Sequence, residues 1–306
     1  MNYSVIIPTF NVSEFILETI DSVLNQTQKG FEIVIVDDGS EDDTCLLIER
    51  LNDPRINLIK LDHTGNIGKN MNYGILNSKY DLICILGADD LWESDKIEIQ
   101  MNYLDKYNFV CSNGSIISKS GDITQEKYIG NFEGDKDLST CDLLENNYVI
   151  ASSIAGFKDK FIQYGNFDEK DGRKAEDYIL WLNVTDNEKI KFINRNLIKY
   201  RVHGNNISFR NSTNRISMLI KTYNIRKVYF DNSTEENIRI CAQNGMASLL
   251  NELYKICYMN KMFYRSRVFL SKRISLQTDK FSVEYFKLLV KLTIINIKYY
   301  LRRIKS

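Results

Sequence analysis

Two adjacent carboxylates, Asp89 and Asp90, follow the apolar run Leu82–Leu86 after Gly87, and Trp92 closes the segment. A continuous apolar run of this length is typical of a strand buried on both faces of a parallel sheet. Carboxylates at the carboxyl end of such a strand lie where open α/β sheets bind ligands, and two oxygen ligands suit a divalent metal that carries phosphates. An Asp-rich turn without any ligand fits the same residues.

Polar side chains also follow two earlier expected strands. Thr9 and Asn11 come after residues 4–8, and Asp37 and Asp38 come after residues 31–36. Because parallel strands bring their carboxyl ends to one edge of a sheet, we expect these groups and Asp89 to line a crevice for a base, a ribose and a metal-bound diphosphate. Neither a GxGxxG motif nor a P-loop follows the first strand, which argues against a dehydrogenase-type dinucleotide fold.

Two further groups could carry chemistry. Glu176 and Asp177 open an expected helix, where acidic residues either complement the helix dipole or supply a general base. His203 is one of only two histidines and stands beside Gly204 in a polar loop. It is either a metal ligand or a surface histidine.

The elements that must position these groups alternate along the chain. Strands are expected at 4–8, 31–36, 56–61 and 82–86, with helices from about residue 13, at 44–51 and at 66–77. This alternation predicts a parallel α/β sheet with right-handed crossovers. A helix at 94–107, a strand at 108–118, an irregular segment at 119–147 and a strand at 149–157 follow. The helix that begins near Glu176 precedes strands at 190–194 and 197–202.

The C-terminal third is expected to be helical, with helices at 216–230, 234–259, 264–271 and 283–304. Residues 207–306 hold 19 Lys or Arg and 6 Asp or Glu, although the whole chain has no net charge. In the last helix Lys287, Lys291, Lys298 and Arg302 share one face of about 60°. Apolar residues lie off that face: Leu288, Leu289, Leu292, Ile295 and Tyr299. The pattern fits either a helix in a membrane interface or one packed on the rest of the protein.

Six cysteines without a CxxC pair indicate reduced, mostly buried thiols. There is no apolar run long enough for a transmembrane helix and no signal-peptide pattern. We therefore expect a cytoplasmic protein, with a possible peripheral position on the inner face of the cell membrane through its basic tail. A nucleic acid partner is not expected.

Together these segments resemble glycosyltransferase family 2, whose fold is called GT-A. The matching motifs are SVIIPTFN from Ser4, IVIVDDGSEDDT from Ile33, NIGKNMNYGI from Asn66, LGADDLW from Leu86, Glu176-Asp177 and YRVH from Tyr200. Each motif alone is of modest specificity, but their order and spacing are specific. The resemblance covers roughly residues 3 to 210. It implies a GT-A domain at 1–210, with a mostly parallel nucleotide-binding sheet flanked by helices, and a C-terminal helical region at 211–306.

The resemblance also implies a donor site for a nucleotide-sugar, most simply a UDP-sugar. Asp38 would accept from the uracil ring, and Asp89 would contact the ribose or sugar. The family often has Arg where Met71 stands, so either Lys69 substitutes for its diphosphate contact or that contact is absent. The donor-site residues that the resemblance implies are Pro8, Thr9, Asn11, Asp38, Lys69 and Asp89.

The remaining implied roles are catalytic. Asp90 and His203 would ligate a divalent metal, Mn²⁺ or Mg²⁺, and Asp177 would be the catalytic base, with Glu176 beside it. The family often has Asp where Gly87 stands, so the metal would depend more heavily on Asp90 and His203.

We therefore expect a metal-dependent, inverting glycosyltransferase that acts on a saccharide or lipid-linked saccharide acceptor in surface polysaccharide synthesis, such as capsule or O-antigen. The alternative is a degenerate sugar-nucleotide binding or scaffold protein without transfer activity. A nucleotidyltransferase is disfavoured, because residues 8–11 do not form the glycine-rich, basic loop that such an enzyme needs.

Overall fold

The computed structural model describes residues 1–130, 133–170, 175–204, 212–277 and 283–304. The chain divides into two compact units. Unit 1 comprises residues 1–143 and 147–204, and unit 2 comprises residues 144–146 and 205–306. The boundary expected between residues 210 and 211 lies outside the described residues, and it stays a prediction.

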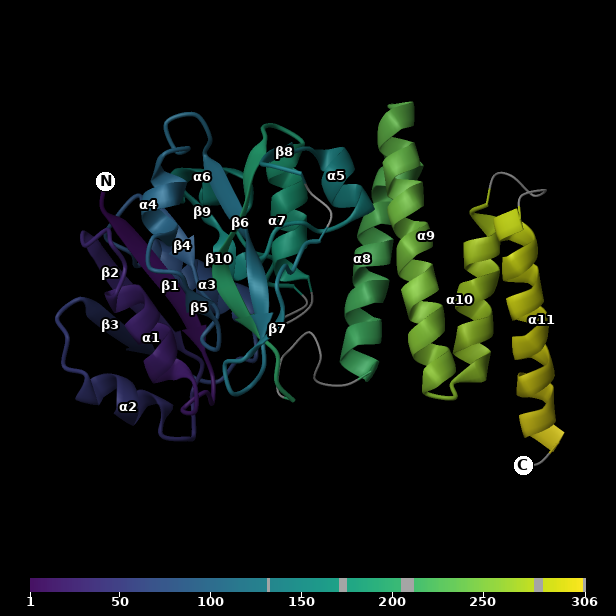
Figure 1. The fold of residues 1–306 in the computed structure, drawn as a ribbon, viewed down its shortest axis with the longest axis horizontal. Helices are drawn as coiled ribbons and strands as arrows, with labels where there is room; N and C mark the ends of the chain where they lie inside the picture. Colours follow the sequence, from purple (N-terminus) through teal and green to yellow (C-terminus); the bar gives the residue numbers. More distant parts are fainter. Residues whose placement is uncertain (131–132, 171–174, 205–211, 278–282, 305–306) are drawn as a thin grey trace. The chain divides into compact units, whose positions relative to one another are not determined.

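Four parallel strands form the first half of the sheet in unit 1, in the spatial order β3-β2-β1-β4 (Figure 1). Their bounds are β1 Tyr3–Thr9, β2 Phe31–Asp37, β3 Ile56–Lys60 and β4 Leu82–Ile85. The apolar runs of β1, β2 and β4 are buried, whereas β3 is an edge strand and partly exposed. The predicted parallel sheet is confirmed here.

The second half of the sheet is mixed. β9 (Ala155–Phe157) runs antiparallel between β4 and β6 (Phe109–Ile117), and β10 (Ile190–Arg201) runs parallel to β6. β10 replaces the two strands expected at 190–194 and 197–202, and its register shifts where they were expected to separate. The segment 119–147, expected to be irregular, contains β7 (Ile123–Gln125) and β8 (Lys136–Leu138). β5 (Leu91–Trp92) pairs antiparallel with β10.

Seven helices and a short 3₁₀ helix at Ala151–Ser153 connect the described strands before residue 190. The helices are α1 Ile16–Leu24, α2 Thr44–Arg50, α3 Ile67–Leu76, α4 Lys96–Met101, α5 Thr140–Glu145, α6 Lys158–Gln163 and α7 Glu176–Thr185. α3 packs on β1 and β2. It approaches closely at Gly74, where a Cβ atom would lie 2.5 Å from Ile6 Cγ2. The helix expected from about residue 13 begins at Ile16.

Unit 2 contains four long helices, as expected. Their bounds are α8 Ser212–Asn232, α9 Glu236–Met259, α10 Phe263–Ser275 and α11 Val283–Ile304. Each packs against the next in chain order (Figure 1). Among the described residues, no helix combines the length and the apolar character that crossing a membrane requires.

The apolar side of α11 is packed inside unit 2. Leu288 and Ile295 are buried with Leu270, and Leu292 packs against the same cluster. Of the two alternatives from the sequence, this face of α11 therefore packs on the rest of the protein and does not face a membrane. Its apolar residues thus bury themselves against the neighbouring helices, as expected for the apolar side of an amphipathic helix.

Four cysteines carry free thiols, as expected: Cys45, Cys84, Cys111 and Cys257. Burial raises the pKa of Cys84 to about 11, so that thiol stays protonated and unreactive near neutral pH. Cys141 and Cys241 differ from the expectation of six reduced thiols, because both are disulfide-bonded in the structure.

Candidate active site

The sheet order reverses beside β1. β2 and β3 follow on one side of β1, whereas β4 pairs on its other side. Such a reversal leaves a crevice at the carboxyl ends of the strands, which is where open α/β sheets bind ligands. Thr9 ends β1, Asp38 follows β2, and the segment 87–90 follows β4. The fold thus brings three predicted site segments to one edge of the sheet.

The Asp38 carboxylate builds the loop that follows β3. It is buried, and its oxygens accept from Thr64 N and Gly65 N at 2.9 Å each and from Thr64 Oγ1 at 3.0 Å. Burial alone would raise the pKa of Asp38, but hydrogen bonds from Thr64, Gly65 and Asn70 outweigh it and hold the pKa below its usual value. Asp38 is therefore an ionised group with most of its acceptor positions filled by its own loop.

An aromatic pair lies next to this loop. The rings of Phe10 and His63 stack with centroids 4.3 Å apart and planes 24° apart. His63 Nδ1 lies 2.8 Å from the Asp38 carbonyl oxygen, and half of the His63 side chain is exposed. A flat, partly exposed pair beside Thr9 offers a stacking surface to a nucleobase. Reasoning from sequence missed it, although an aromatic residue directly after Thr9 was a possible signal.

The other residues predicted at the end of β1 have structural contacts. Thr9 is buried and donates through Oγ1 to the Ile7 carbonyl oxygen at 3.1 Å. Asn11 adopts a left-handed backbone conformation, with φ 49°. Its side-chain oxygen accepts from the backbone N–H groups of residues 41 and 42, at 2.8 and 3.3 Å. Asn11 therefore shapes the loop after β2, and the Thr9 carbonyl oxygen accepts from Asp38 N at 2.9 Å.

His203 pairs with Asp89. Its Nε2 lies 2.9 Å from Asp89 Oδ2, and the Phe15 ring covers the imidazole at a centroid distance of 4.7 Å. A carboxylate oxygen and an imidazole nitrogen are a ligand pair that Mn²⁺ accepts, with further positions left for phosphate oxygens and water. The described residues contain no cluster of three or more His, Cys, Asp or Glu suited to a metal. Among the described residues, Asp89 and His203 are therefore two potential ligands that do not belong to a larger cluster of this kind.

Asp90 is in a different environment from Asp89. The Asp89 side chain is 24% exposed, whereas Asp90 is 2% exposed. Asp90 Oδ1 accepts from Arg201 N at 2.8 Å, and its Oδ2 accepts from the Ser152 hydroxyl. Burial, and then the neighbouring Asp89 charge, raise the pKa of Asp90 well above its usual value. The structure thus pairs His203 with Asp89, and the assignment of Asp90 and His203 as metal ligands stays a prediction.

Gly87 explains why the acidic run is short. A Cβ atom there would lie 3.1 Å from both Asp90 Oδ2 and Ser152 Oγ, and 3.3 Å from Asp89 Oδ1. Gly87 N donates to Ser152 Oγ at 3.0 Å. The backbone at Gly87 therefore lies directly against the two carboxylates, and the site leaves little room for a third.

Arg201 connects four segments and was not predicted as a site residue. Its guanidinium is buried and donates to the carbonyl oxygens of Asp89 and Lys119, each at 2.9 Å, and to Glu18 Oε2 at 2.6 Å. Its backbone N–H reaches Asp90. The planar guanidinium holds the Asp89 backbone and the Arg201 backbone N–H holds the Asp90 carboxylate, so Arg201 fixes the segment that carries Asp89.

Glu176 and Asp177 begin α7, as predicted. Ala175 precedes them in a left-handed conformation, with φ 51°. Asp177 Oδ2 accepts from Trp181 Nε1 at 3.2 Å, one helical turn along. Trp181 is fully buried, so it holds the carboxylate on a rigid helix.

The start of α7 is linked to α3 through the segment 167–169. Asn72 donates to the Phe167 carbonyl oxygen at 2.9 Å and accepts from Phe167 N at 3.0 Å. Asp168 N in turn donates to the Glu176 carbonyl oxygen at 3.0 Å. Lys69 is exposed in the first turn of α3, where backbone N–H groups and the helix dipole favour an anion. The predicted base and the predicted diphosphate contact thus depend on one connected framework.

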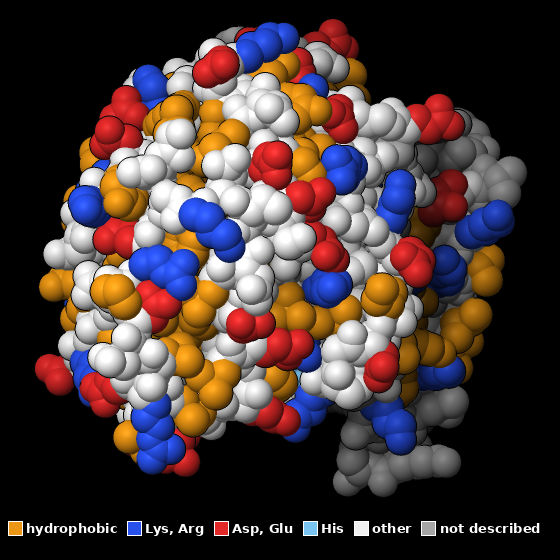
Figure 2. All heavy atoms as spheres, turned by 60° about the vertical axis from the view of Figure 1, so that its left-hand side comes forward, with side chains coloured by type: hydrophobic (Ala, Val, Ile, Leu, Met, Phe, Trp, Pro, Cys, Tyr) orange, Lys and Arg blue, Asp and Glu red, His pale blue; other side chains and the backbone are white. Residues whose placement is uncertain are grey.

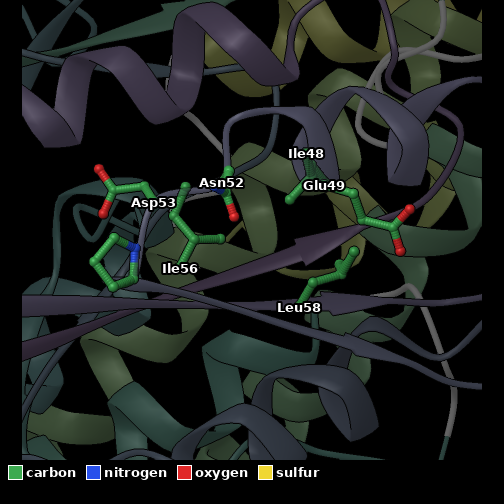
Figure 3. Close-up of a pocket in the computed structure, with 7 residues that line it drawn as sticks. Ile48, Glu49, Asn52, Asp53, Ile56 and Leu58 are labelled. Atoms are coloured by element: carbon green, nitrogen blue, oxygen red, sulfur yellow. The ribbon is translucent and has the colours of Figure 1, made fainter.

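A hollow of about 280 Å³ lies elsewhere, at the edge strand (Figure 3). Its lining comes from α2, the loop after it and β3, and the carboxylates of Glu49 and Asp53 point away from one another. Both are paired, with Lys60 and Arg55. On the face drawn in Figure 2, acidic and basic side chains are interspersed. The carboxylates at this hollow are therefore engaged in ion pairs, and its lining contains no carboxylate–imidazole pair like Asp89 and His203.

Residues 4–167 match the sequence profile described as Glycosyl transferase family 2. An uncharacterized glycosyltransferase of Rickettsia felis is 30% identical over 305 residues, which cover 96% of this chain and 48% of that protein. The chain thus spans about half the length of this relative. WfaP of Escherichia coli, a UDP-Glc:α-D-GlcNAc-diphosphoundecaprenol β-1,3-glucosyltransferase, is 32% identical over 232 residues, which cover 73% of this chain and 85% of that protein.

Among solved structures, Staphylococcus aureus TarS 1–349 in complex with UDP-GlcNAc is similar with a TM-score of 0.65 and 16% sequence identity. The match covers 90% of this chain and 81% of TarS 1–349. At this identity the likeness shows the fold. The GT-A architecture implied by the sequence motifs is therefore confirmed.

Proposed function

The chain belongs to glycosyl transferase family 2, and on this premise we propose that it transfers a sugar from a UDP-sugar to a lipid-linked saccharide. The observation that carries the proposal is the Asp89–His203 pair at the point where the sheet order reverses beside β1. The relatives WfaP and WfgD, which by name act on a GlcNAc-diphosphoundecaprenol acceptor, support the acceptor class. Such acceptors suit surface polysaccharide synthesis at the inner face of a membrane, and that location stays a prediction.

The donor would bind across the crevice. The Phe10–His63 pair offers the base a stacking surface beside the β1 backbone, and the start of α3 with Lys69 faces the negative charge of a diphosphate. We assign the metal-binding role to Asp89 and His203, in place of Asp90 and His203. Asp90 instead holds the loop by accepting from Ser152 and Arg201. A divalent metal bound there supplies positive charge to the diphosphate as it leaves.

Asp177 would act as the base. The acceptor oxygen attacks the anomeric carbon of the donor sugar while the bond from that carbon to the diphosphate oxygen breaks. The electron pair leaves with UDP, and the hydroxyl proton moves to an Asp177 carboxylate oxygen. Because one displacement takes place on the face opposite the leaving group, the anomeric configuration inverts. The Trp181 N–H donates to this carboxylate at the start of α7 and holds it in place.

Release of UDP from a panel of UDP-sugars, measured with Mn²⁺ and a GlcNAc-diphospholipid acceptor, tests the function. We expect transfer with at least one donor, and a loss of about 10²–10⁴-fold in kcat for Asp177→Asn, with donor binding retained. Asp159→Asn is a matched control, because Asp159 is exposed in the first turn of α6. If the wild type binds a donor but transfers no sugar from any donor of the panel, the chain is a sugar-nucleotide binding protein without transfer activity.

A further inference from the structure

Helix α11 has an apolar face that the packing of unit 2 leaves uncovered. Leu288, Leu292 and Ile295 face the neighbouring helices. Val290, Ile294 and Ile297 are 60%, 45% and 54% exposed. At about 100° per residue, these three lie within about 60° of one another and nearly opposite the buried side. The helix therefore has two apolar faces, and only one of them has a partner within the described residues.

A row of lysines borders the exposed apolar face. Lys287, Lys291 and Lys298 are exposed and lie about 60° to 100° around the helix from Val290. Lys298 also contacts the Tyr258 hydroxyl through its ammonium group, which holds it at this border. Glu284 is the only acidic residue between residues 283 and 304. An apolar stripe next to a basic row is the pattern of a helix that lies in a membrane interface.

We propose that the α11 face formed by Val290, Ile294 and Ile297, with its row of lysines, binds the surface of an anionic lipid bilayer. The apolar stripe would enter the boundary between headgroups and acyl chains, and the ammonium groups would reach lipid phosphates. This inference rests on the proposed function in one respect, because a lipid-linked acceptor is located in a membrane and the enzyme must reach it there.

The charge argues against a second copy of the chain as the occupant. An antiparallel symmetric dimer would place this face against itself with the lysine rows of both copies on the same side of the interface. Like charges across an interface weaken association. Residues 207–306 as a whole also hold more basic than acidic residues. An anionic surface attracts this positive charge, whereas a second copy of the chain repels it.

Co-sedimentation of the full chain with vesicles tests the proposal. Vesicles of equal parts phosphatidylglycerol and phosphatidylcholine are compared with pure phosphatidylcholine vesicles. We expect the wild type to bind the anionic vesicles and to dissociate as salt screens the charges. Replacing the three row lysines by Gln is expected to weaken this partition about 100-fold, since each lysine near the surface contributes about fivefold. Replacing Val290, Ile294 and Ile297 by Gln is expected to weaken it at least about tenfold.

Two variants serve as controls in the same unit. Lys227, Lys255 and Lys272 are also exposed, so their Gln variant loses the same charge away from the proposed face. Val228 and Ile240 are exposed on α8 and α9, so their Gln variant removes apolar surface elsewhere. Both controls are expected to bind anionic vesicles within about threefold of the wild type. Circular dichroism of each variant is measured to check that its helices are retained.

Three outcomes would overturn the membrane role: no vesicle binding by the wild type, equal binding by the α11 variants, or equal loss in the controls. If the apolar variants change the oligomeric state and not vesicle binding, the face belongs to a second copy. UDP release with a short, water-soluble acceptor separates this inference from the proposed function. That activity is expected to be unchanged in the α11 variants, and its absence in the wild type would count against the function alone.

Discussion

Asp89 and Asp90 show how two neighbouring residues of one type acquire separate roles. Asp89 is partly exposed and pairs with His203, whereas Asp90 is buried between Ser152 and Arg201. The sequence shows two carboxylates after a buried strand and predicts a ligand site there, which stays a prediction. It could not show which carboxylate is buried, because the partners that decide this stand 62 to 114 residues away along the chain.

We predict that Asp90→Ala lowers the free energy of unfolding by about 1–3 kcal/mol, because the Ser152 hydroxyl and the Arg201 N–H lose their buried acceptor. Asp89→Ala is expected to change it by less than about 0.5 kcal/mol, since Asp89 is partly exposed. Mn²⁺ affinity is expected to fall at least about tenfold in Asp89→Ala. Urea denaturation and Mn²⁺ titration of both variants provide the measurements. Unchanged stability with abolished Mn²⁺ binding in Asp90→Ala would restore the assignment made from sequence.

Lys96 is a buried cation that the sequence did not single out. It is fully buried, its ammonium lies 2.5 Å from Gln100 Oε1, and it sits 4.1 Å from the centre of the Trp92 ring. Burial lowers the pKa of Lys96 to about 8, and the nearby thiols of Cys84 and Cys111 raise it slightly in return. Burying a charge in this way destabilises the folded state at neutral pH.

The pH dependence of this cost is predictable. The pKa of Lys96 is about 8 in the folded chain and about 10.4 when unfolded, so the unfolded chain binds more protons between these values. The Lys96 contribution to stability therefore rises with pH across that window, by about 3 kcal/mol in total. Compared with Lys96→Met, the wild type is expected to gain this amount between pH 8 and pH 10.5 in urea denaturation.

Taking the difference between the two proteins removes the effect of groups that titrate in both and do not interact with Lys96. Lys189 is exposed, so Lys189→Met is the matched control and is expected to show no such gain. A constant stability difference between wild type and Lys96→Met from pH 8 to pH 10.5 would mean that the ammonium is hydrated in the folded protein.

At the scale of elements, periodicity predicted most of unit 1 correctly. The strands β1, β2 and β4 carry apolar runs, and the bounds of β1 to β4 agree with the prediction within one residue at either end. β10 was divided into two predicted strands because polar Asn194, Arg195 and Asn196 interrupt its apolar pattern. The structure tolerates them where the register shifts. β7 and β8 were missed because three-residue strands are fixed by their partners β6 and β10, which local sequence does not reveal.

The end of β10 is held to its surroundings by Arg201. We predict that Arg201→Gln lowers the free energy of unfolding by about 1–3 kcal/mol, because the carbonyl oxygens of Asp89 and Lys119 lose their donors. Transfer activity is expected to fall at least about tenfold, together with Mn²⁺ affinity, because the Asp89–His203 pair is no longer fixed. Arg201→Lys is expected to restore little of either property, since an ammonium cannot reproduce the planar set of donors.

Arg195→Gln is the control for that variant. Arg195 lies on the same strand but its ion pair with Asp95, at 3.2 Å, is exposed, and such pairs contribute little to stability. The variant is expected to match the wild type within about 0.5 kcal/mol and to retain activity. Equal Mn²⁺ affinity in wild type and Arg201→Gln would limit Arg201 to a role in folding.

At the scale of the whole molecule, the two units can be observed separately. Each has buried clusters of its own: the sheet core in unit 1, and two helical clusters in unit 2. The chain has two tryptophans, Trp92 and Trp181, and both belong to unit 1. Tryptophan fluorescence therefore reports the unfolding of unit 1, whereas far-UV circular dichroism also follows the long helices α8 to α11 of unit 2.

We predict that UDP with Mn²⁺ raises the midpoint temperature of the transition seen by tryptophan fluorescence. The midpoint temperature at which the helices of unit 2 unfold, followed by far-UV circular dichroism, is expected to stay unchanged. The ligand binds groups of unit 1, so at a concentration 100 times its dissociation constant it adds about 2.7 kcal/mol to that unit alone. Thermal scans with both probes, with and without UDP and Mn²⁺, provide the measurement. Asp89→Ala is the control, and in it the shift is expected to shrink, because Mn²⁺ no longer joins the nucleotide to the protein. An equal shift in both probes would show that the units unfold as one cooperative body, since only then does binding at the β1–β4 crevice stabilise helices outside its own unit.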